Sequence, residues 1–160
     1  MKSRKIISIT LALITALFAV MSCIPTALAA EYQANGATYF TFTDSGITVS
    51  EGTYDGYKIE GTSLTINDSG TYVLSGNCAD GSVKIKKGTT GVTLVLNGLT
   101  LTISTTAPIA CNKSTEVRII VASGSVNTLT DSAKNNDDNY PDNTDAENAV
   151  IKCKDGSQVT

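Results

Sequence analysis

Strand-like segments recur along this chain in phase, and this recurrence limits the possible folds more than any other feature of the sequence. Each segment alternates apolar and polar residues, which is the pattern of a half-buried β-strand. Four segments that place two inward-type residues around one polar position start 26, 26 and 42 residues apart, at 57–59, 83–85, 109–111 and 151–153. A second series, Ile66, Val92, Val117 and Val159, has intervals of 26, 25 and 42 residues. Two independent series therefore keep nearly the same phase.

This phase predicts an all-β chain folded as a parallel β-helix, a solenoid with coils of about 25 residues. Each coil would cover the apolar face of the one before it. Turn residues, among them Asp68-Ser69-Gly70, Asn97-Gly98 and Ser123-Gly124, are expected to separate the strands. A β-sandwich is the alternative, but it gives no reason for the phase to persist. Residues 39–42 and 47–49 are expected to form the first strands and to cap one end of the core.

The first 29 residues have the pattern of a secretory signal peptide. Lys2, Arg4 and Lys5 precede an apolar stretch from residue 6 to about 20, and Ala27-Leu28-Ala29 is a small-residue cleavage site. We therefore expect a secreted, extracellular protein, with attachment to the cell surface as a variant of this. An uncleaved anchor helix and lipid attachment at Cys23 are the alternatives.

Residues 30–160 suit a single domain, and its charge excludes several classes of partner. Without the signal peptide, nine basic residues face fifteen acidic ones, a balance of −6, so neither nucleic acid nor an anionic membrane is an expected partner. The chain has no histidine, which removes the usual serine-hydrolase triad and most zinc chemistry. Because the sequence stops at Thr160 in an expected strand, we expect further coils or domains beyond it.

A polar insertion at 131–148 explains the longest interval, which exceeds the others by 16 or 17 residues. It carries six carboxylates and several asparagines, including Asp131, Asp137, Asp138, Asp142, Asp145, Glu147 and Asn148. Oxygen ligands at this density suit Ca²⁺, although the spacing is not that of an EF-hand. A solvated acidic loop that binds nothing specific is the alternative.

Three cysteines follow the signal peptide, and two of them hold the same position in successive coils. Cys111 and Cys153 are expected to be neighbours in the core, while Cys78 lies apart. They either fill the core as small apolar side chains or form a disulfide, for which parallel Cβ vectors are unfavourable. An inward position would deny both the exposure that a redox role needs.

Groups suited to carbohydrate lie on the expected outer surface. Alternation places four lysines there, Lys84, Lys86, Lys152 and Lys154. This strip would meet the carboxylates of an acidic polysaccharide, or it is an ordinary solvated surface. Tyr54 and Tyr140 offer aromatic faces for sugar rings, whereas Tyr57 belongs to the inward series.

The order of motifs resembles a known family over roughly residues 47–160. The motifs are Gly61-Thr62-Ser63-Leu64-Thr65-Ile66, Gly70-Thr71-Tyr72-Val73-Leu74-Ser75-Gly76, Val92-Thr93-Leu94-Val95-Leu96-Asn97-Gly98, Asn127-Thr128-Leu129-Thr130-Asp131 and Asn148-Ala149-Val150-Ile151. They resemble the calcium-containing β-helix carbohydrate-binding domains of secreted clostridial proteins, which are similar in fold to pectate lyases. The resemblance implies a right-handed parallel β-helix, bound Ca²⁺ at the acidic loop, and attachment to polygalacturonate or pectin, with cellulose as a further candidate.

Three functions are therefore weighed. The first is a non-catalytic module that holds acidic polysaccharide through Ca²⁺ and a cationic or aromatic strip. The second is a polysaccharide lyase, which needs a base beside Ca²⁺; Arg118 is the only arginine after the signal peptide and has no visible relation to the acidic loop. The third is an adhesive solenoid without sugar specificity.

Overall fold

The computed structural model describes residues 34–52, 55–103, 106–131 and 149–160. The signal peptide, the two tyrosines Tyr54 and Tyr140, and the acidic insertion after Asp131 lie outside these residues. All regular elements in the described part are β-strands, so the predicted all-β class is confirmed. No helix in this part is long and apolar enough to cross a bilayer.

The strands follow one another at short intervals along the chain. They are β1 (Thr38–Thr43), β2 (Gly46–Val49), β3 (Tyr57–Glu60), β4 (Ser63–Ile66), β5 (Gly70–Cys78), β6 (Ser82–Ile85), β7 (Val92–Ile103), β8 (Ile109–Cys111), β9 (Glu116–Val121), β10 (Thr128–Asp131), β11 (Ile151–Cys153) and β12 (Gln158–Val159).

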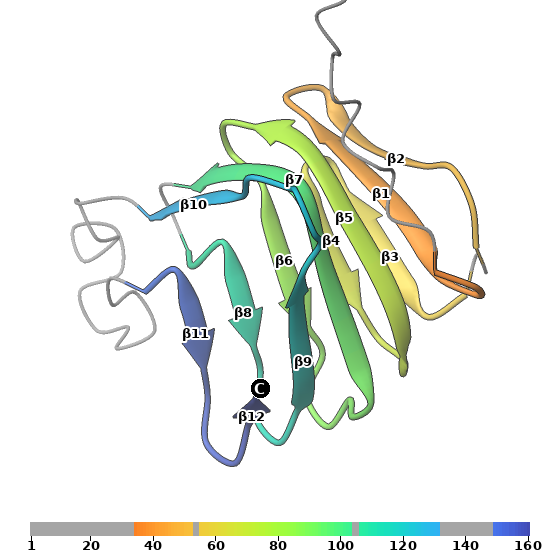
Figure 1. Ribbon diagram of the computed structural model, residues 1–160. Coiled ribbons are helices and arrows are strands. Elements are labelled where there is room, and N and C mark those ends of the chain that lie inside the picture. The colour runs from red at the N-terminus through yellow and green to blue at the C-terminus, as the bar shows by residue number, and fades with distance from the viewer. Residues whose placement is uncertain (1–33, 53–54, 104–105, 132–148) are drawn as a thin grey trace, which may run out of the picture.

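These strands form two sheets (Figure 1). The first sheet has the order β12-β9-β7-β5-β1-β2, with β10 also paired to β7, and the second sheet has the order β11-β8-β6-β4-β3. From β4 to β9 the chain alternates between the two sheets. The hairpins β1–β2 and β3–β4 are antiparallel and all other pairs are parallel. Both sheets are thus mixed, and neither closes into a barrel.

The later members of both predicted series are paired as expected. Val83 pairs with Ile109, which pairs with Ile151 in the second sheet. Val92 pairs with Val117, which pairs with Val159 in the first sheet. The intervals of 25, 26 and 42 residues therefore mark true neighbours in these strands.

The first members of both series were predicted wrongly. Leu64, not Tyr57, pairs with Val83, and the partner of Val92 is Gly70, because Ile66 belongs to the other sheet. The cause is a tight turn at residues 61–62, which folds β3 back onto β4 in antiparallel register. Gly61 in this turn has φ +60°, a left-handed conformation that glycine adopts without strain.

The turn predicted at Asn97-Gly98 is a bulge inside the long strand β7. The pairing with β5 shifts there, from Leu74 opposite Leu96 to Gly76 opposite Leu99. The side chain of Asn127 fills the gap in the ladder: its Oδ1 accepts the Leu99 amide hydrogen at 2.8 Å and its Nδ2 donates to the Leu96 carbonyl at 3.3 Å. Figure 1 shows β7 bending sharply along its length.

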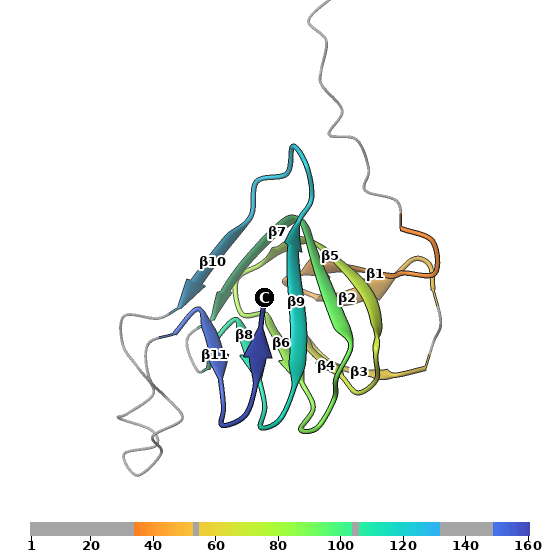
Figure 2. The same cartoon turned by 60° about the horizontal axis from the view of Figure 1, so that its bottom comes forward.

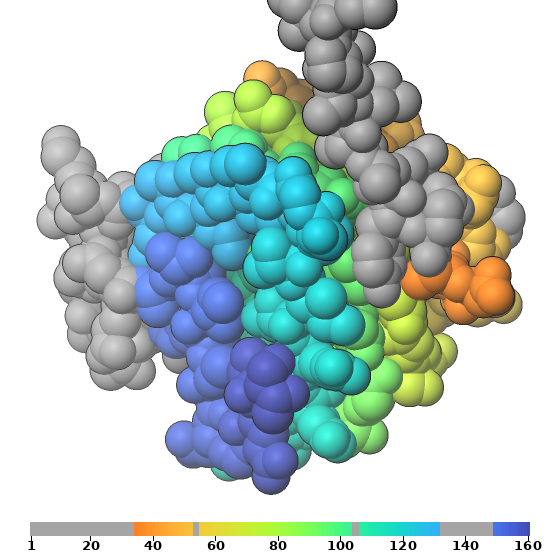
Figure 3. Space-filling model, viewed as in Figure 1, coloured from red at the N-terminus to blue at the C-terminus, as the bar shows by residue number. Residues whose placement is uncertain are grey.

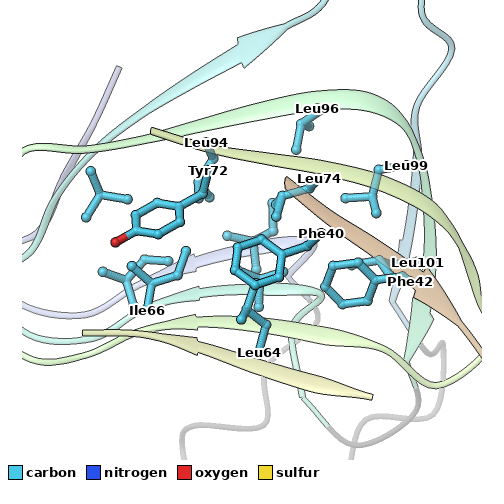
Figure 4. Packing of buried hydrophobic residues seen from close by; sticks show 14 of the residues in the cluster. Phe40, Phe42, Leu64, Ile66, Tyr72, Leu74, Leu94, Leu96, Leu99 and Leu101 are labelled. Carbon is cyan, nitrogen blue, oxygen red and sulfur yellow. The ribbon is translucent and has the colours of Figure 1, made fainter. Parts of the chain in front are cut away.

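The apolar core lies between the two sheets. Side chains from β1, β4, β5 and β7 point toward one another there (Figure 4), among them Phe40, Phe42, Leu64, Ile66 and Leu74. Each of these five is fully buried, which stabilises the fold by about 1.5–3 kcal/mol per side chain. Strands β1 and β2 confirm the first strands expected at 39–42 and 47–49.

The two cysteines expected to be neighbours are paired in register, and both are unbonded thiols. Cys153 of β11 lies opposite Cys111 of β8. Cys111 is buried, but Cys153 is exposed, so the expectation that both are shielded was wrong for Cys153. The reason is that β11 is the outermost strand of the second sheet, at one end of the molecule in both Figure 1 and Figure 2. Residues 149–160 form part of the surface in Figure 3.

Candidate functional site

A row of aligned residues crosses all five strands of the second sheet, and we call it the lysine row. Its members are Lys58, Thr65, Lys84, Ala110 and Lys152, each paired with the next across the sheet. Lysine therefore alternates with a small residue. Since neighbouring strands lie about 4.8 Å apart, the lysines recur roughly every 10 Å.

Alternation along the strands places the lysine row on the face away from the core. Leu64 and Ile66 flank Thr65 and are fully buried, and the residues on either side of Lys84 are fully buried as well. Lys58 is exposed, and Lys84 and Lys152 are half-buried. The stems of these lysines thus lie along the sheet while the ammonium groups reach solvent.

Glu60 is an acidic neighbour of the lysine row. Its Oε1 lies 2.7 Å from the Lys58 Nζ. The hydrogen bond and charge of Lys58, with a smaller effect from the charge of Lys84, hold the pKa of Glu60 below its usual value despite a small opposing effect of burial. Glu60 is thus ionised at neutral pH and offsets part of the positive charge at the β3 end of the row.

A shallow polar depression of about 320 Å³ lies next to the row, where β4 and β6 end; we call it the end depression. Two turns form it, because parallel strands bring their following turns to the same edge of the sheet. The residues that line it are Asn67, Asp68, Ser69, Lys86, Lys87, Gly88, Thr89 and Thr90. The lining offers hydroxyl, amide, carboxylate and ammonium groups, which are the groups that bind sugar hydroxyls and carboxylates.

Backbone hydrogen bonds hold the two turns of the end depression together. The Lys86 amide donates to the Ile66 carbonyl at 2.8 Å, and the Gly88 amide donates to the Lys113 carbonyl at 3.0 Å. The Thr89 hydroxyl donates to the Asn67 carbonyl at 3.3 Å. The depression is therefore built on paired backbone, and its exposed Lys86 and Lys87 side chains stand on a fixed frame.

The four lysines selected from the sequence fall in connected places. Lys84 and Lys152 share the lysine row, separated by Ala110. Lys86, two residues after Lys84, lines the end depression and links it to the row. Lys154 continues the β11 ladder, since its amide donates to the Cys111 carbonyl at 3.0 Å. By contrast, Tyr54 and Tyr140 lie outside the described residues.

Of the expected calcium ligands, the structure describes only Asp131. Its Oδ2 accepts a hydrogen bond from the Ala149 amide at 2.7 Å, so this carboxylate ties together the two ends of the insertion. Asp137, Asp138, Asp142, Asp145, Glu147 and Asn148 lie outside the described residues. Within the described part of the chain, no group of three or more histidine, cysteine, aspartate or glutamate side chains is placed to hold a metal ion.

Sequence reasoning missed several residues of this surface. Lys58 occupied the polar position of the first aligned segment, but it was not selected because the segment's apparent neighbour was misassigned. Lys87 belonged to the same cationic run as Lys86, and Asp68 and Ser69 were recognised only as turn residues. Nothing in the sequence placed the two turns at 67–69 and 86–90 side by side, because that follows from the β4–β6 pairing.

Comparison with known proteins identifies the family. A model of the family of carbohydrate-binding domain-containing proteins matches residues 60–159, which is more than half of the chain. The chain belongs to this family. No curated protein and no solved structure matches it. The matched span of this carbohydrate-binding domain includes the end depression and every lysine of the row except Lys58, so membership supports carbohydrate binding by the part of the chain that carries this surface.

Proposed function

We propose that this protein is secreted and non-catalytic, and that it binds acidic plant cell-wall polysaccharide, polygalacturonate or pectin, along the lysine row. The observation that carries the proposal is the alternation of lysine with small residues across five paired strands. A polymer lying across the strands would meet a cation roughly every 10 Å without a bulky side chain between. Cellulose carries no charge and would use only the polar groups of the end depression.

The charge distribution favours a local cationic site over general attraction. The chain after residue 29 has a balance of −6, so a polyanion would be repelled from most of its surface. The lysine row reverses this sign locally, and ammonium–carboxylate contacts are among the stronger hydrogen bonds available to an exposed site. Lys86 and Lys87 extend the positive charge into the end depression.

Calcium is part of the proposal through the acidic insertion. Asp131 places one carboxylate where the insertion leaves β10, and the insertion's further carboxylates supply oxygen atoms, which Ca²⁺ prefers. A divalent ion between an acidic protein and an acidic polymer would reduce their repulsion. We therefore propose that Ca²⁺ strengthens binding.

For the scaffold we infer a right-handed parallel β-helix. Support comes from the chain's alternation between two sheets and from the parallel pairing of successive strands within each sheet. Parallel crossover connections are almost always right-handed. Such a scaffold is stiff, which would keep the lysine spacing fixed.

Affinity electrophoresis in gels containing polygalacturonate tests the function. The double variant Lys84→Gln/Lys152→Gln loses two contacts of about 0.5–1 kcal/mol each, so its retardation should report an affinity about 5- to 30-fold weaker. Lys113→Gln/Arg118→Gln is the matched control, because it removes the same charge from residues outside the row. Chelation of Ca²⁺ should weaken retardation of the wild-type protein.

Three results would overturn the proposal. Equal retardation of the two double variants would remove the lysine row from the site. Equal retardation in a neutral galactan gel would show that the polymer's carboxylates are not recognised. Release of unsaturated uronides that absorb in the ultraviolet would establish the alternative, a polysaccharide lyase, although Arg118 is an exposed residue of the first sheet.

A further inference from the structure

The paired cysteines at the edge of the second sheet have a geometry suited to a metal ion. Cys111 and Cys153 are directly opposite one another in the parallel pair β8–β11, and both are unbonded thiols. Residues paired in this way project from the same face of the sheet with nearly parallel Cα–Cβ bonds. The two sulfur atoms are therefore about one strand spacing apart, about 4.8 Å.

This separation is poorly matched to a disulfide. A disulfide needs an S–S bond of about 2.05 Å and Cβ atoms about 3.8 Å apart, with a Cβ–S–S–Cβ angle near 90°. Parallel side chains on strands about 4.8 Å apart meet none of these requirements without movement of the backbone.

The same separation matches two metal–sulfur bonds. A bond from a thiolate to a closed-shell ion such as Zn²⁺ is about 2.3 Å long, so two such bonds in line span about 4.6 Å. Parallel Cβ–Sγ bonds are then roughly perpendicular to the sulfur–metal–sulfur axis, which is close to the bond angle that a thiolate sulfur prefers.

A third group points to a ligand at this place. The Thr115 hydroxyl is buried, with 2% of the residue exposed, and its Oγ1 makes no hydrogen bond of ordinary geometry. It nevertheless lies close enough to the Cys111 thiol to act on it as a weak donor, which lowers the pKa of that thiol. A buried hydroxyl without a full partner costs about 1–3 kcal/mol, so it indicates a site that something else completes.

We propose that Cys111 and Cys153 bind one soft monovalent ion, Cu(I) or its analogue Ag(I), in two-coordinate geometry with the Thr115 hydroxyl beside it. Thiolates select such ions over hard cations. Zinc is a poor fit, because it takes four ligands and the described residues offer no third cysteine, histidine or carboxylate at this place. On binding, both thiols release their protons to solvent and the ion keeps its oxidation state.

The proposal also gives the exposed cysteine a role. Cys153 offers the entry point from solvent, and the buried Cys111 provides the second bond. Because β11 is the outermost strand of its sheet, the ion would fasten β11 to β8. Burial, followed by the charge and hydrogen bond of Cys153, raises the pKa of Cys111 to about 12, so the metal-free pair remains protonated at neutral pH.

Native mass spectrometry of the reduced full chain with Ag(I), and anaerobic competition for Cu(I) against a chromogenic chelator, test this site. Every protein in the comparison carries Cys23→Ser, so that the cysteine of the signal segment adds no binding. We expect one ion per chain, a melting temperature raised by the ion, and at least a 100-fold loss of affinity in Cys153→Ser. Cys153 is exposed, so this variant should fold. Cys78→Ser is the matched control, because Cys78 is a buried thiol in another strand.

The expected pattern is loss of binding in Cys153→Ser and retention in Cys78→Ser. No bound ion in the parent protein, or equal binding by both variants, would overturn the proposal. So would oxidation of the parent to an intramolecular disulfide, seen as a loss of two hydrogen masses, together with no binding by the reduced form.

Discussion

At the scale of single residues, Tyr72 links the core to the end depression. Its ring belongs to the buried cluster and packs against Phe40, with ring centroids 6.2 Å apart. Its hydroxyl donates to the Asp68 carbonyl at 3.0 Å, in one of the turns that line the depression. Burial, and secondarily the charge of Asp68, raise the pKa of the Tyr72 phenol.

This pKa predicts an alkaline loss of stability. The folded chain favours the neutral phenol, so the stabilisation is fully present below the unfolded pKa of about 10 and is lost as the pH rises through the folded pKa. Thermal unfolding measured at pH 8 and pH 11 should show a smaller alkaline decrease for Tyr72→Phe than for the wild type. At pH 8 the variant should be less stable by about 0.5–1.5 kcal/mol, because the hydrogen bond is lost. An alkaline decrease of equal size in both proteins would contradict this role.

Lys58 shows how far a single residue could be placed from sequence. Alternation correctly gave its side of the strand, and it shares a row with Lys84 and Lys152. Its distance from Lys84 was not predictable, because the intervening Thr65 enters the row only through the β3–β4 hairpin.

At the scale of elements, the bulge in β7 depends on a residue far away in sequence. Asn127 bonds both backbone groups that the bulge leaves without a ladder partner, those of Leu96 and Leu99. Its Nδ2 also donates to the Ser125 Oγ at 2.9 Å. The segment before β10 is therefore fixed to the bend in β7.

Replacing Asn127 with alanine should destabilise the fold by about 1–3 kcal/mol, because buried backbone groups of β7 lose their partners. The exposed Asn77 of β5 is a matched position, and Asn77→Ala should change the stability by less than about 0.5 kcal/mol. Urea unfolding of both variants measures the difference. If the two substitutions cost the same, Asn127 does not support the bulge.

The hairpins β1–β2 and β3–β4 explain why the regular interval fails at the start of the chain. Turns at residues 44–45 and 61–62 close each hairpin within the chain's first described strands. Local closure costs little conformational entropy, so these strands pair with their sequence neighbours. The later strands pair with segments about 25 residues away.

At the scale of the whole molecule, stability should fall from the middle strands toward one end. Strands β5 and β7 each pair with neighbours on both sides, whereas β11 and β12 are outermost in their sheets. Val150 and Ile151 beside this edge are also 38% and 40% exposed. This edge therefore buries less apolar surface than the centre.

Hydrogen exchange followed by nuclear magnetic resonance should reveal this gradient. We expect the paired amides of β5 and β7 to exchange at least about 100-fold more slowly than those of β12, because edge strands open locally while central strands exchange only through larger openings. Uniform protection across the two sheets would show instead that the molecule opens as a single unit.

The sequence by itself determined the all-β class, the position of most strands, and the side of the sheet that each lysine occupies. Alternation decides these properties locally, since successive side chains point to opposite faces. It also gave the correct partners wherever the interval stayed near 25 residues, as for Val92 and Val117. Only the tertiary structure decided the two hairpins, the continuous path of β7, the full lysine row and the end depression. These depend on which strands become neighbours, and that choice follows from turn closure and burial of the shared core, which no single segment encodes.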